Sequence, residues 1–194
     1  MTKTKDHNVS FAWLGILGIV TFVISWICAI AMDPSWTFAE NTLSEFGISD
    51  TDAQYFFNYG CCLISGALVI LFGFGNIISA KNSGYQAGGI LIMIAGALLA
   101  LVGIVTMDVG NGNLHDYVAE TMALFLLLSI IALAAANWVA DRKMLSGVSI
   151  VIVFILVAMM LNYTVAEVEA YGVILIAIWI LMESVRMIMT SGKD

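Results

Sequence analysis

Four titratable residues that could act together lie just after the third apolar run of this sequence and in the first turns of the fourth, namely Asp108, His115, Asp116 and Glu120. Asp116 and Glu120 are four residues apart, so on a helix they share one face and repel each other unless water, a proton or a cation lies between them. Glu120 also lies more than one turn inside the fourth run, where an ionisable side chain is costly and indicates a function. The pattern predicts a site that binds a divalent metal through carboxylate and imidazole ligands, or that holds a proton.

The first long polar connection supplies further candidates. Asp33 can cap a helix whose first position is Pro34, and we expect a short amphipathic helix over residues 34–46. Such a helix would lie along the membrane surface or roof the bundle, above the acidic cluster. The predicted site comprises Glu40, Ser44, Glu45, Asp108, His115, Asp116 and Glu120, and the predicted metal ligands among them are Asp108, His115, Asp116 and Glu120.

A solvated acidic surface explains the same residues without a site. Asn113 and Asp116 form a capping-box pattern at the start of the fourth run, which is a sufficient structural reason for Asp116. A divalent metal is the only cofactor indicated, and the sequence leaves its presence open.

The elements that must position these residues are membrane-spanning helices. Hydrophobic residues make up 61% of the chain and the mean hydropathy is +1.00, which excludes a water-soluble domain of this length. Most of the apolar runs reach the roughly 20 residues that cross a bilayer as a helix. We therefore predict an all-α polytopic fold, a single domain over residues 1–194, with spans at 11–32, 55–80, 87–107, 114–140, 147–163 and 170–190.

Charge predicts how these spans are oriented. Every Lys and Arg falls at a terminus, in alternate connections or near the inner end of the last span, whereas ten of the 14 Asp and Glu residues fall on the other side. By the positive-inside rule, the basic side faces the cytoplasm. The chain is expected in the plasma membrane with both termini cytoplasmic.

Small and sulfur-containing residues predict packing more than chemistry. Gly89, Gly96 and Gly103 recur every seven residues, and small residues let helices approach closely in lipid. Packing within the chain is one interpretation, and a homo-oligomer through these faces is the other. Cys28 could bridge Cys61 or Cys62 if the outside is oxidising, or all three cysteines could be free.

Two short elements resemble a known family. One is Asn41-Thr42-Leu43-Ser44-Glu45-Phe46-Gly47, after Asp33-Pro34-Ser35-Trp36, and the other is Asp108 followed by His115. They resemble a bacterial and archaeal family of six-span membrane proteins of unknown function, which commonly has a Ser-Glu-Leu-Gly-like first outer loop. Phe46 replaces the usual leucine. The resemblance implies the six-span fold and supports Ser44, Glu45, Asp108 and His115 as outer-site residues, without giving them a role.

Three functions are open at this stage. The preferred one is a protein that binds a lipid or a small solute, or supports a membrane partner. The second is a metal-assisted hydrolase or transferase acting on an outer-leaflet lipid, with His115 as ligand or base and Ser44 as nucleophile. The third is a proton-coupled transporter that uses Glu120. Membrane lipids are the expected partners, and the absence of a basic stripe in the sequence argues against nucleic acid.

Overall fold

Six of the helices in this computed structural model, which describes residues 3–191, are long and apolar enough to cross a membrane. Their order gives an all-α polytopic protein. The first span belongs to α1 (Lys3–Met32), and the second runs through α2 (Ala53–Tyr55), η2 (Phe56–Ile64) and α3 (Ser65–Ile78). The remaining spans are α4 (Ser83–Val102), α5 (Asn113–Val139), α6 (Lys143–Asn162) and α7 (Val165–Thr190). Two short 3-10 helices, η1 (Leu43–Ile48) and η3 (Val109–Asn111), lie in the connections at one end.

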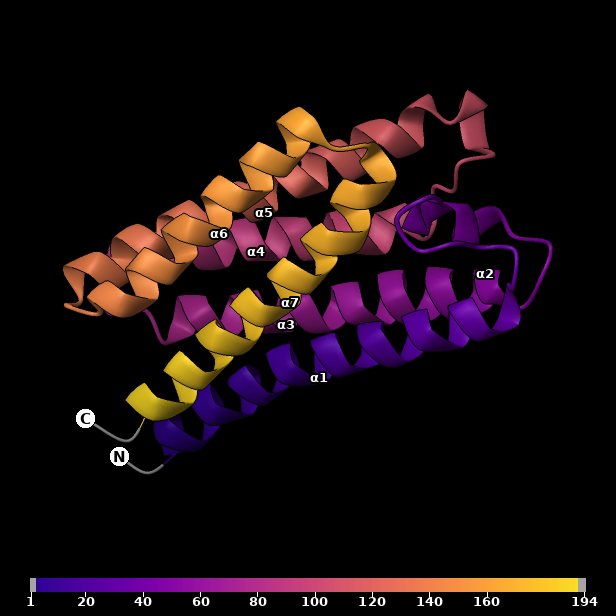
Figure 1. Ribbon diagram of the computed structural model, residues 1–194. Coiled ribbons are helices and arrows are strands. Elements are labelled where there is room, and N and C mark those ends of the chain that lie inside the picture. The colour runs from indigo at the N-terminus through magenta and orange to yellow at the C-terminus, as the bar shows by residue number, and fades with distance from the viewer. Residues whose placement is uncertain (1–2, 192–194) are drawn as a thin grey trace.

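The helices follow one another around the bundle. α1 packs on α3, α3 on α4, α4 on α5 and α5 on α6, and α7 then crosses obliquely from α6 to α1 (Figure 1). We call the end that holds η1 and η3 the acidic end, and the end that holds the short α3–α4 and α5–α6 turns the basic end. α1 begins and α7 ends at the basic end (Figure 1), which places both on one side as the charges predict.

Several helix boundaries differ from the predicted spans, and polar caps explain the earlier starts of α4 and α7. α4 begins at Ser83 because the Asn82 side chain accepts a hydrogen bond from Tyr85 N, and it ends at Val102 where residue 107 was expected. α7 begins at Val165 because Thr164 and Glu167 form a capping box.

The second span contains an unusual helical segment. η2 is a π-helix of nine residues, and the Ser65 hydroxyl donates to Gly60 O at 2.8 Å where the helix returns to α geometry. Gly60 lies against α1 so closely that an added Cβ would be 2.0 Å from Ser25 Oγ. Only glycine allows this approach of the two helices.

Glycines also set the contact between α3 and α4. A Cβ on Gly66 would meet Gly96 O at 2.6 Å, and a Cβ on Gly96 would meet Gly66 O at 2.9 Å. Gly73 and Gly89 form a second reciprocal pair, with distances of 2.8 and 2.7 Å to each other's carbonyl oxygens. These four glycines are therefore used within the chain, and a homo-oligomer remains a prediction that cannot use them.

The α3–α4 contact gives a first testable prediction. Gly96→Leu should lower the free energy of unfolding by about 2 kcal/mol or more, because the new side chain meets backbone that cannot move aside. Ala97→Leu is the matched control, since Ala97 is the next residue and is exposed on the bundle surface. Thermal unfolding in detergent measures both variants. Equal melting temperatures for the two would contradict the packing.

Candidate functional site

The segment between α1 and α2 does not form the helix predicted over residues 34–46. Asp33 accepts a hydrogen bond from Ser35 N at 3.2 Å and so starts a turn, and Ala39 has a φ of 63°, which no right-handed helix allows. Helical geometry begins only at Leu43, after Trp36 Nε1 has closed the loop by donating to Thr42 O at 2.8 Å. The competing side-chain bonds explain the error, because turn contacts satisfy the backbone that a helix would have used.

Glu45 holds this connection together. Its Oε1 accepts from Thr42 N at 2.9 Å and from the Thr42 hydroxyl at 3.1 Å, and its Oε2 accepts from Asn41 Nδ2 at 2.7 Å. Asn41 in turn accepts from Thr37 N. Glu45, which the sequence placed in the predicted site, is thus occupied as a structural acceptor.

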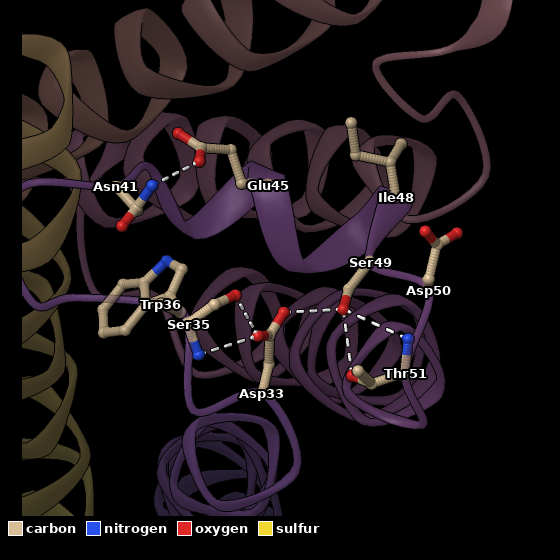
Figure 2. A pocket seen from close by; sticks show the side chains of 9 residues that line it. All are labelled: Asp33, Ser35, Trp36, Asn41, Glu45, Ile48, Ser49, Asp50 and Thr51. Carbon is tan, nitrogen blue, oxygen red and sulfur yellow. Dashed lines mark hydrogen bonds between the residues drawn. The ribbon is translucent and has the colours of Figure 1, made fainter.

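A hollow of about 360 Å³ lies beside these hydrogen bonds of Glu45. Figure 2 shows Asp33, Ser35, Ser49 and Thr51 joined by hydrogen bonds on one side and Glu45 on the other. The hydroxyls of Ser35 and Ser49 lower the pKa of the Asp33 carboxyl. The stability these bonds contribute is therefore present above the ordinary pKa of an aspartate and is lost as the pH falls through the lowered value.

Glu169 of α7 fixes the connection onto the bundle. Its Oε2 accepts a hydrogen bond from Leu43 N at 2.6 Å, and the backbone N–H of Ser44 also donates to this carboxylate. Ser44, the proposed nucleophile, is buried with 6% of its surface exposed. In the sequence Glu169 is one of the ten acidic residues on the outer side, and no capping pattern marks it, whereas Glu167 stands at capping-box spacing from Thr164.

His115 is buried at the same place, with 3% of its surface exposed. Its Nδ1 lies 2.6 Å from Val105 O, and since a carbonyl oxygen can only accept, Nδ1 carries the proton. Its Nε2 is buried and has no hydrogen-bond partner among the described residues. His115 and Glu45 both lie within electrostatic range of the Glu169 carboxylate, so the structure brings together three acid–base side chains from α5, η1 and α7.

The other predicted site residues lie apart from this group. Glu40, Asp108, Asp116 and Glu120 are exposed, and Asp108 accepts from the Thr106 hydroxyl. No three His, Cys, Asp or Glu side chains among the described residues are grouped so as to hold a metal ion, and a metal there stays a prediction.

The structure also decides two predictions about the start of α5 and the cysteines. The capping box of Asn113 and Asp116 does not form, because Gly112 occupies the cap position of α5 and Asp116 N donates to its carbonyl oxygen at 3.1 Å. Cys28, Cys61 and Cys62 are free, so the bridge considered for Cys28 is not formed.

An apolar groove of about 450 Å³ opens between α6 and α7. The lining residues of each helix are three or four positions apart, so they lie on one face of α6 and one face of α7. Tyr163, Glu167 and Tyr171 stand where the groove meets the acidic end, and the edge of the Tyr171 ring contacts Phe38 at 5.4 Å between centroids. The apolar walls below them are Ile155, Met159, Ile174 and Leu175.

A buried network of polar side chains occupies the basic half of the bundle. Arg186 pairs with Glu183 one turn earlier in α7 and donates to Asn76 Oδ1 at 2.6 Å. Asn137 Nδ2 donates to the second oxygen of Glu183 at 2.8 Å, and Asn137 Oδ1 accepts from the Tyr85 hydroxyl at 2.7 Å. The Arg186 network consists of Asn76, Tyr85, Asn137, Arg142, Glu183 and Arg186.

The sequence suggests only a local pair of Glu183 and Arg186 in this region. In the structure their side chains are 0% and 7% exposed, respectively, and they join α3, α4, α5 and α7. The Arg186 guanidinium also lies over the Tyr85 ring, 4.4 Å from its centroid. The sequence signal for this network is the position of Asn76, Asn137 and Glu183 inside apolar runs, because polar groups at membrane depth need partners.

These features define an all-α, six-span integral membrane protein with networks of polar side chains at both ends of the bundle. The chain belongs to the family described as protein of unknown function (DUF998), which matches residues 16–186. The match includes Ser44, Glu45, Asp108 and His115, the residues that carried the resemblance. No curated protein and no solved structure matches the chain.

The role of Glu169 can be tested by hydrogen exchange. In Glu169→Gln the amide keeps the shape of the side chain but loses the charge that the Leu43 and Ser44 amides donate to, so their exchange should become about tenfold faster or more. Glu120→Gln is the control, because Glu120 is an exposed carboxylate of the same end. Unchanged exchange in Glu169→Gln would show that Glu169 does not hold η1.

The Arg186 network gives a stability prediction. Arg186→Met leaves the Glu183 carboxylate buried without its cation and should cost about 3–5 kcal/mol of unfolding free energy. Glu183→Gln/Arg186→Met removes both charges and should be more stable than the single variant. Lys143→Met breaks the exposed pair with Asp141 and should cost less than about 1 kcal/mol. The prediction fails if the single and double variants unfold alike in mixed micelles.

Proposed function

We propose that this protein binds a membrane lipid, with one acyl chain in the groove between α6 and α7. The observation that carries the proposal is the groove itself, which has apolar walls in the membrane-spanning part and tyrosines with one carboxylate at its mouth. Its volume falls in the range of about 300–1,000 Å³ that is usual for small-molecule sites.

The length and place of the groove suit an acyl chain. Ile155 and Tyr163 are eight residues apart on α6, or about 12 Å at 1.5 Å per residue. One leaflet of hydrocarbon is roughly 15 Å deep, so the groove runs along most of a single leaflet. Tyr163 and Tyr171 stand at the level where aromatic rings prefer the interface.

The arrangement of charge supports the outer leaflet as the source of the lipid. The described Lys and Arg side chains of the α3–α4 and α5–α6 turns lie at the basic end, which the positive-inside rule assigns to the cytoplasm. The α6–α7 turn lies at the opposite end (Figure 1), and Tyr163 and Glu167, which flank this turn, line the groove.

Native mass spectrometry of the purified protein in a defined phospholipid tests the proposal. Ile174→Trp should fill the groove and lower the fraction of lipid-bound protein about tenfold, which corresponds to roughly 1.4 kcal/mol of chain contact. Ile178→Trp is the matched control, because Ile178 is an exposed isoleucine one turn further along α7 and does not line the groove. Equal lipid retention by the two variants would rule out the groove as the lipid site.

A further inference from the structure

We infer that the lipid taken by this groove is a phospholipid whose headgroup carries a primary ammonium, a phosphatidylethanolamine. This inference rests on the proposed lipid-binding function and adds the class of headgroup. It follows from the charge, the hydrogen-bonding capacity and the rigidity of the groove mouth.

The charge at the mouth is negative. Glu167 contributes a carboxylate, and of the described residues that line the groove none is Lys or Arg. A phospholipid with a net negative headgroup would bring its charge to this carboxylate without a compensating cation. A zwitterionic headgroup places its ammonium there instead.

Glu167 is held in place to receive that ammonium. Its Oε2 accepts from Thr164 N at 2.8 Å and from the Thr164 hydroxyl at 3.0 Å, which fixes the side chain against the start of α7. Among the described residues none donates to the other oxygen, Oε1, which is left as an acceptor at the mouth of the groove. An acceptor of this kind favours a primary ammonium, which donates three hydrogen bonds, over a quaternary one, which donates none.

The two tyrosines complete the match with the headgroup. Tyr163 and Tyr171 are 54% and 42% exposed, so their rings and hydroxyls are accessible at the mouth. Their hydroxyls can donate to the phosphate oxygens without adding positive charge. The mouth therefore offers a neutral donor for the phosphate and an anion for the ammonium.

The experiment is competition between lipids of identical acyl chains in native mass spectrometry, with phosphatidylethanolamine, phosphatidylcholine and phosphatidylglycerol at equal concentration. Wild type should retain phosphatidylethanolamine about fivefold more than either of the others. Glu167→Gln should lose this preference, because the neutral amide no longer attracts the ammonium, and the retained phosphatidylethanolamine should fall to the level of the other two lipids. The new amide oxygen still accepts from Thr164, and an unchanged melting temperature confirms the fold.

Glu120→Gln is the control for net charge, because it neutralises an exposed carboxylate of the same end outside the groove, and it should keep the wild-type preference. Lipid retained at the groove with no headgroup preference, or with phosphatidylcholine or phosphatidylglycerol preferred, would overturn the headgroup class and leave the lipid-binding proposal standing. Loss of lipid from wild type itself, or retention unaffected by Ile174→Trp, would overturn both.

Discussion

The buried guanidinium of Arg186 needs hydrogen-bond and charge partners, and this need constrains how the helices of the bundle pack. Arg186 lies roughly 6 Å from the end of α7 at 1.5 Å per residue, and with 7% exposure it cannot be solvated by water. An unpaired charge in such surroundings costs several kcal/mol, so the helices must bring Glu183 and Asn76 to it. Because Asn137 and Tyr85 in turn satisfy Glu183, a single charge fixes the relative positions of α3, α4, α5 and α7.

The rotation of α7 that these contacts impose also decides the chemistry of the other end. Glu169 precedes Glu183 by 14 residues, about four helical turns, so both carboxylates point to the interior of the bundle. Glu169 there accepts a hydrogen bond from Leu43 N of η1 and lies within electrostatic range of His115. Glu167 and Tyr171 are turned toward α6 by the same rotation and so reach the mouth of the groove. The side chains that hold η1 and those that line the groove thus lie on different faces of α7.

Close backbone approach makes these placements rigid. In lipid the hydrophobic effect does not hold helices together, and short contacts such as those of Gly66 with Gly96 supply dispersion contacts instead. The π-helix η2 makes a similarly close contact with α1, where Gly60 leaves room for the Ser25 side chain. The connection above can then be irregular, because Glu45 and Glu169 supply acceptors for its backbone.

The sequence by itself determined the class of this protein, since hydropathy and apolar run length require six membrane-spanning helices whatever their packing. The seven-residue glycine repeat likewise predicted tight contacts, because a helix presents such residues on one side. Tertiary structure alone decided which polar residues meet: no pattern in the sequence indicates a partner for Glu169, and Glu183 with Arg186 looks like a local pair. Their partners lie on other helices, 46 to 126 residues away for Asn137 and Leu43. Periodicity within a helix reports the face of a residue, and only the packed bundle sets what that face contacts.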